Sequence, residues 1–271
     1  GTGMAATNSV GVRTGNVSAG TSVFAMVVLE RPLSKVYPEI DLVTTPDGRP
    51  VAMVHVNTCT SDLDAWVGMF GQLLEAAGAK LSKSQLYELL YRQALSGEPD
   101  CGGLVSFNCY SGEPVTGLEE GRPLFVRSPE AKLTLGNFMR AQLYAAMATL
   151  SIGMDLLWKE GVTVEKLYGH GGLFKTKGVG QKLLAGALGV PVAVMETAGE
   201  GGPWGMALLA AYRKDRQGEE TLPDFLENHV FAGAAGEQVP PSLEDQEGFG
   251  WYIARYKQAL AVEKAAGEAL R

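Results

Sequence analysis

A short segment, Gly20-Thr21-Ser22, combines residue types that suit the binding of phosphate groups. It lies within residues 16–29, which read as two β runs folded about this segment. Backbone amides and two small hydroxyls at such a tip can hold a β- or γ-phosphate without bulky side chains in the way. The same spacing also fits a plain hairpin turn that binds nothing. The residues alone leave both interpretations open.

A second region with this chemistry spans residues 164–212. Its pattern predicts a strand, a glycine turn, a helix, a strand, a glycine loop and a helix, in that order. Gly171-Gly172 is expected to lead directly into the first helix, and Gly201-Gly202 into the second, with Pro203 in its first turn. Free backbone N–H groups at helix starts can hold phosphates, and glycine allows the close approach. A single turn of this kind often binds nothing, but two around one βα unit favour a nucleotide site.

These segments resemble the nucleotide-binding half of the FGGY carbohydrate kinases, the xylulokinase and rhamnulokinase group. Ser18-Ala19-Gly20-Thr21-Ser22 is similar to the family's Gly-Thr-Ser phosphate motif. The second half of the resemblance is carried by Gly171-Gly172, Gln181, Pro191-Val192, Glu196 and Glu200-Gly201-Gly202-Pro203-Trp204-Gly205-Met206-Ala207. The last of these loops keeps the family's Glu200, Gly205 and Ala207 and departs between them.

The resemblance implies that the protein uses ATP with Mg²⁺. It assigns the Gly-Gly pair to the α-phosphate, and it places the adenine between the helix of Gln181 and residues 201–207. The ATP-binding residues that it implies are Gly20, Thr21, Ser22, Gly171, Gly172, Gln181, Glu200, Gly201, Gly202 and Gly205. No protein metal ligand is expected.

The implied fold is α/β, a ribonuclease H-like (actin-like ATPase) domain with a mixed sheet flanked by helices. Residues 1–271 are expected to form the C-terminal domain of such a kinase. Residues 1–212 would be its core, and residues 213–271 a loop with a C-terminal helical extension. The longest helix is expected over residues 137–159, because its start resembles the family's His-Leu-x-Arg-Ala-x-Leu motif.

In this family the catalytic Asp lies upstream of the Gly-Thr-Ser motif. The chain has no Asp or Glu before Glu30, so the expected position falls upstream of Gly1 and no catalytic residue is assigned here. The sugar substrate would be a ketose or polyol bound through an N-terminal half absent from this chain, which alone would be inactive. A homodimer of the full-length enzyme is compatible with the resemblance.

Composition narrows the choice of partners and of cellular compartment. The chain has 271 residues, of which 46% are hydrophobic and 20% charged, with a net charge of −7. An acidic chain without clustered Lys and Arg argues against nucleic-acid or anionic-membrane partners. The three cysteines, Cys59, Cys101 and Cys109, form no metal-binding pattern and are expected to be reduced thiols of a cytoplasmic protein.

The elements around the turns also follow from the pattern. Residues 41–56 read as a hairpin, with His55 as a core or interface side chain. Helices are expected over residues 63–77, over residues 82–95 and near the C-terminus. The expected buried side chains of the first two helices are Trp66, Met69, Phe70, Leu73, Leu74, Leu86, Leu89, Leu90 and Tyr91. Asp62 and Asp64 fit the first helical turn better than a catalytic pair.

The sequence is also compatible with two other classes of function. The chain could be a non-catalytic module of the actin or Hsp70 type that uses the nucleotide as a switch. A Rossmann-type domain is disfavoured, because neither glycine loop has the Gly-x-Gly-x-x-Gly spacing after a first strand.

Overall fold

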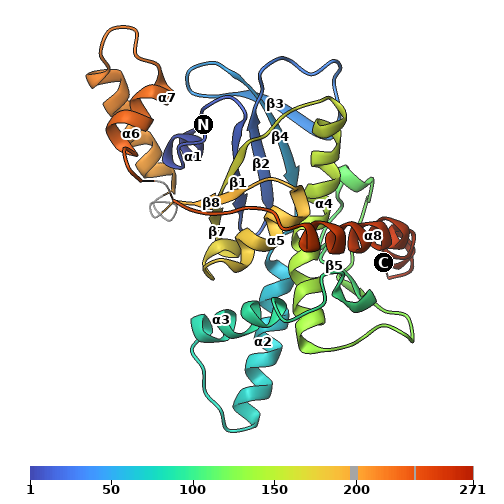
Figure 1. The fold of residues 1–271 in the computed structure, drawn as a ribbon. Coiled ribbons are helices and arrows are strands. Elements are labelled where there is room, and N and C mark those ends of the chain that lie inside the picture. The colour runs from blue at the N-terminus through green and yellow to red at the C-terminus, as the bar shows by residue number, and fades with distance from the viewer. Residues whose placement is uncertain (196–200, 235, 271) are drawn as a thin grey trace.

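A seven-stranded mixed sheet forms the centre of the molecule (Figure 1). The computed structural model describes residues 1–195, 201–234 and 236–270. In space the strands follow the order β3-β4-β2-β1-β7-β8-β9. Their bounds are β1 Thr14–Ala19, β2 Val23–Val28, β3 Ile40–Thr44, β4 Pro50–Val56, β7 Lys166–Gly171, β8 Val192–Val194 and β9 Glu237–Val239. β1, β7 and β8 run parallel to one another, and the other pairs are antiparallel. The mixed sheet is therefore confirmed.

Helices cover both faces of this sheet. The larger core lies on the face to which β1 directs Val17 and Ala19, beneath α4 (Leu135–Lys159) and α5 (Val179–Leu188). On the same side lie α2 (Ser61–Ala76), α3 (Lys83–Ala94), α8 (Leu243–Ala269) and the small β5–β6 pair (Val105–Phe107 and Leu124–Val126). A smaller core on the opposite face packs under α1 (Thr2–Ala6), α6 (Gly201–Asp215) and α7 (Leu222–Phe225). Successive strand residues alternate between these two cores.

The local elements predicted around the glycine turns are present. β1 and β2 form the hairpin about residues 20–22, and β3 and β4 form the second hairpin. One boundary was wrong. Gly172–Phe174 forms a short 3-10 helix, and α5 begins only at Val179, where Gly178 is the N-cap. The strand β9 was not foreseen, because its three residues carry no alternating apolar pattern.

Several expected core positions are instead exposed. Met69, Leu73 and Leu89 are 48%, 64% and 44% exposed. The physical reason is visible in Figure 1, where α2 and α3 project as a pair beyond one end of the sheet. The apolar stripe of a helix is fully buried only where another element covers it. On α2 the buried residues are therefore near its start, at Asp62, Leu63 and Val67.

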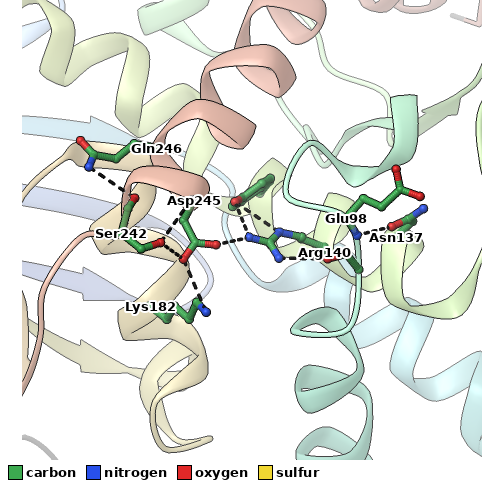
Figure 2. A network of polar contacts seen from close by, with 9 residues as sticks. Glu98, Asn137, Arg140, Lys182, Ser242, Asp245 and Gln246 are labelled. Atoms are coloured by element: carbon green, nitrogen blue, oxygen red, sulfur yellow. Dashed lines mark hydrogen bonds and ion pairs between the residues drawn. The ribbon is translucent and has the colours of Figure 1, made fainter.

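A buried ion pair fastens α8 to α4. Arg140 of α4 and Asp245 of α8 are 3% and 4% exposed and contact each other directly (Figure 2). The Arg140 guanidinium also donates to the Tyr144 hydroxyl at 3.1 Å and to the Gly97 carbonyl at 3.2 Å. Ser242 donates to Asp245 at 2.6 Å. The network satisfies both buried charges, and α8 is therefore held firmly against the main core.

We expect Asp245→Asn to destabilise the fold by on the order of 3 kcal/mol, because it leaves the Arg140 charge buried without a counter-ion. The free energy of unfolding in urea measures the effect. Asp155→Asn is the matched control, since it breaks the exposed Lys257–Asp155 pair and should cost less than about 1 kcal/mol. Equal losses in the two variants would contradict this account of the network.

None of the described helices combines the length and the apolar composition that a membrane span requires.

Candidate functional site

The two glycine turns lie side by side at the carboxyl ends of neighbouring parallel strands. β1 and β7 pair in a register that sets Ala19 opposite Gly171, so Gly20 and Gly172 each follow directly after the last paired residue. Gly20, Thr21 and Gly171 are exposed, and Ser22 and Gly172 are partly exposed. Carboxyl ends of parallel strands are where α/β proteins bind ligands. Pairing across roughly 150 residues of chain thus creates one surface from two separate motifs.

Glycine is required at position 171 by its close contact with β1. Its φ of 101° lies in the left-handed region, and an added Cβ would come within 2.3 Å of the Ala19 carbonyl oxygen. Gly172 is different, because a Cβ there would lie 3.9 Å from the same oxygen. Gly171 therefore allows the turn to form, and Gly172 leaves the space beside it open.

The start of α2 anchors the Gly20–Ser22 turn. The Thr60 backbone N–H and hydroxyl both donate to the Gly20 carbonyl, at 3.1 and 2.8 Å, and the Cys59 N–H donates to the Thr21 carbonyl at 2.7 Å. The Asn108 side chain in turn donates to the Cys59 carbonyl at 2.8 Å. The carbonyl groups of Gly20 and Thr21 therefore already accept hydrogen bonds from the start of α2. A turn whose carbonyls are already bonded presents less negative character to an anion.

A cavity of about 550 Å³ opens between α2, α3 and the turn after β7. Thr60, from the anchor, and Gly172, from the glycine turn, both line it. The other lining residues are Asp64, Lys83, Ser84, Tyr87, Glu88, Tyr91, Lys175 and Thr176. Lys83 lies over the Tyr87 ring, with its nitrogen 5.7 Å from the ring centre. The cavity is large enough for a nucleotide, and its lining combines two tyrosine rings with two lysines and two carboxylates.

Asp64 and Tyr87 hydrogen-bond to each other at the wall of this cavity. Burial and the neighbouring Asp64 carboxylate raise the pKa of Tyr87, which therefore remains a neutral donor. Asp62, on the inner side of the same helical turn, accepts from Trp66 Nε1 at 2.9 Å, and burial raises the pKa of its carboxyl group. Both carboxylates lie in the first turn of α2, as expected.

A second cavity, of about 870 Å³, lies between α5 and α6 on the other side of residues 172–176. Gln181 and Trp204 line it, so the space predicted for the adenine exists. The Gln181 amide is already engaged at both ends, however. Its oxygen accepts from the Gly178 N–H and its nitrogen donates to the Glu237 carbonyl, each at 2.9 Å. Gln181 therefore caps α5 and fixes β9, and Lys175 borders both cavities.

The glycines at the start of α6 face α1 rather than the glycine turns. A Cβ at Gly205 would lie within 2.0 Å of the Thr2 carbonyl oxygen, and one at Gly202 would lie 3.8 Å from the Thr2 hydroxyl. These positions let α1 and α6 pack closely. Gly201 opens the helix with a positive φ of 62°. Glu196 and Glu200 lie outside the described residues.

Cys59, Cys101 and Cys109 are free and buried, and burial raises the pKa of Cys59 to about 12. In the described part of the chain, no group of three or more His, Cys, Asp or Glu side chains is placed to hold a metal ion. The residues that the sequence did not single out are Thr60, Tyr87 and Lys175, since nothing in their local pattern marks them.

Comparison with known proteins places this chain in a family. The sequence model of the FGGY family of carbohydrate kinases, C-terminal domain, matches residues 15–213. No curated protein matches the sequence.

Solved structures of kinases share the fold. Ligand-bound xylulose kinase and gluconate kinase, both from Lactobacillus acidophilus, each match with a TM-score of 0.75 and 16% identity, over all of this chain and 51% of theirs. Plasmodium falciparum glycerol kinase with ADP matches with a TM-score of 0.68 and 14% identity, over 97% of this chain and 49% of that one. The chain thus spans about half the length of these kinases. The likeness confirms the expected actin-like ATPase fold, and the chain belongs to the FGGY family of carbohydrate kinases.

Proposed function

We propose that this chain is the ATP-binding half of a kinase that transfers the γ-phosphate of ATP to a hydroxyl of a ketose or polyol. The observation that carries the proposal is the pairing of Ala19 with Gly171, which joins two exposed glycine turns into one surface in a member of a sugar kinase family. The catalytic carboxylate and the sugar-binding half would lie outside the chain. The chain alone would then hold nucleotide without turning it over.

The phosphates would lie along the two glycine turns. The backbone of the exposed Thr21 and of the partly exposed Gly172, together with the Thr21 hydroxyl, offers donors to phosphate oxygens. The Gly20 N–H already donates to the Ser22 carbonyl at 2.9 Å. Lys175 adds an exposed cation at the same turn. Mg²⁺ would be held between the phosphate oxygens, where it neutralises charge during phosphoryl transfer. These residues fit such a group, because the turns are open and their carbonyls are tied inward.

For the base we propose the cavity between α2 and α3. This cavity shares Gly172 with the phosphate surface, and its wall includes Thr60, which holds the Gly20 carbonyl. The cavity between α5 and α6, where the sequence predicted the adenine, does not include Gly172 in its lining, and its Gln181 amide already donates one hydrogen bond and accepts another within the fold. Continuity with the phosphate turn favours the first cavity.

Calorimetry with ADP tests both parts of the proposal. We expect the wild-type chain to bind ADP with a dissociation constant on the order of tens of micromolar to millimolar, because an open half-site encloses little of the ligand. Ser84→Glu adds bulk and negative charge to the cavity between α2 and α3, and should weaken binding by about tenfold or more.

The matched variant is Ala232→Glu, which makes the same kind of addition at an exposed position of the other cavity. It should leave ADP affinity unchanged. If only Ala232→Glu weakens ADP binding, the base must bind in the cavity between α5 and α6. Absence of ADP binding by the wild-type chain would overturn the proposed function.

A further inference from the structure

His170 lies beside the glycine turns on the sheet face opposite the nucleotide-sized cavity. It is the last residue of β7 before Gly171, and the parallel register sets it opposite Ser18 of β1. Tyr168 and Asn16, two residues earlier on each strand, lie on the same face, which α1 and α6 cover. His170 itself is only partly buried. A ligand that crosses the ends of β1 and β7 would therefore meet this imidazole.

Asn16 fixes the orientation of the ring. Its amide nitrogen lies 3.2 Å from His170 Nε2, and because an amide nitrogen only donates, Nε2 accepts and the ring proton resides on Nδ1. Asn16 is 1% exposed, yet its Oδ1 finds no hydrogen-bond partner among the described residues. A buried acceptor without a partner is costly, so its presence calls for a function.

We propose that His170 is a phosphate-binding residue of this site, that it becomes a charged imidazolium when nucleotide phosphate binds, and that Asn16 is the positioning residue that permits the change. The inference rests on the proposed nucleotide site. In the bound state the Nδ1 proton would be the donor to the phosphate, and the added proton would come from solvent to Nε2. The new Nε2–H of His170 and the amide N–H of Asn16 would then both be donors facing each other, unless the Asn16 amide rotates by 180° about its last side-chain bond. That rotation presents Oδ1 to the new Nε2–H and satisfies the unpaired acceptor.

We expect the protonation state of His170 to depend on whether a ligand is bound. Of the elements on this face, α1 has no titratable side chain, and in α6 the first titratable side chain is Tyr212, followed by Arg213, Lys214 and Asp215. The segment of α7 and the helical turn after it, residues 222–230, adds Asp224, Glu227 and His229, and Glu227 accepts a hydrogen bond from Asn8 at 2.8 Å. On its own strand Lys166 lies over the Tyr168 ring, and on β4 the exposed His55 is separated from Ser18 by Phe24 of β2. Burial alone lowers the pKa of His170. The free protein therefore holds a neutral ring at neutral pH.

An adjacent phosphate raises the pKa of an imidazole, so binding takes up a proton. ADP affinity should increase as the pH falls through the pKa of the bound state, and the increase ends below the lower pKa of the free state. A shift of about one unit corresponds to about a tenfold gain in affinity.

The test is calorimetry of ADP binding between pH 5.5 and 8.5, in buffers of different ionisation enthalpy, for the wild-type chain and for His170→Gln. Because protonation of ADP itself affects both proteins equally, the difference between them isolates the histidine. We expect wild type to take up more protons per ADP than His170→Gln, and to gain about tenfold more affinity at low pH. His55→Gln, at the exposed position in the same row, should behave as wild type.

Identical pH profiles for wild type and His170→Gln, with ADP bound by both, would overturn this inference and leave the proposed function standing. Absence of ADP binding by wild type at every pH would overturn both. Should His170→Gln fail to fold, nuclear magnetic resonance titration of the three histidines in the wild-type chain decides the matter. The His170 pKa must then rise when ADP is added, and a constant pKa would contradict the proposal.

Discussion

Gly172→Asp is expected to abolish measurable ADP binding while leaving the fold intact. The backbone at Gly172 is not in the left-handed region, and an added Cβ would lie 3.9 Å from the Ala19 carbonyl oxygen, which is an ordinary contact. The carboxylate would, however, project into the surface proposed for the phosphates. Two like charges about 4 Å apart near a protein surface repel by roughly 4 kcal/mol, or about a thousandfold in affinity.

The measurement is calorimetric titration with ADP, accompanied by a thermal unfolding curve. Gly250→Asp is the matched control, because Gly250 is exposed on α8 with open space around it. The control adds the same charge to the chain and should retain wild-type affinity. Unchanged ADP affinity in a folded Gly172→Asp variant would remove Gly172 from the site.

The second large effect concerns catalysis. We expect the chain alone, folded and with nucleotide bound, to transfer no phosphate to any sugar above background. The sequence has no Asp or Glu before Glu30, so α1 carries no acidic side chain. A general base typically contributes roughly 10²–10⁴ in rate, and holding the acceptor in place contributes more. The loss of both should leave no measurable turnover.

A coupled assay of ADP release, with a panel of ketoses, aldoses and polyols, tests this expectation. It is repeated after addition of a separately produced N-terminal half of the parent kinase. Turnover that appears only with the added half would support the proposed division of labour. Sugar-dependent turnover by the chain alone would contradict it.

The local structure around the two glycine turns could be predicted from sequence because it depends on short patterns. The hairpin about Gly20-Thr21-Ser22 follows from two β runs separated by turn residues, and the strand before Gly171-Gly172 follows from a short apolar run bounded by glycines. The α/β fold class that the family resemblance implied is also confirmed. What the pattern could not supply is the β1–β7 register, because pairing between distant segments depends on packing rather than on spacing.

The same limit explains the residues that were missed or misplaced. Thr60 joins the site only because the start of α2 reaches the Gly20 carbonyl, a contact between segments 40 residues apart. Gln181 matched a family motif, but the structure uses both ends of its amide to cap α5 and hold β9. Met69 and Leu73 follow the spacing of a buried stripe, yet α2 extends past the sheet and leaves both exposed. Each of these differences between prediction and structure depends on how distant segments pack together, which short sequence patterns do not show.

The most direct test of the central claim is a crystal structure of the chain soaked with ADP and Mg²⁺. The phosphates should lie across the two adjoining turns, with oxygens within hydrogen-bond distance of the backbone N–H groups of residues 21–22 and 171–172. The base should occupy the cavity lined by Thr60 and Tyr87. ADP bound with its phosphates away from both glycine turns, or no bound ADP at saturating concentration, would contradict the account.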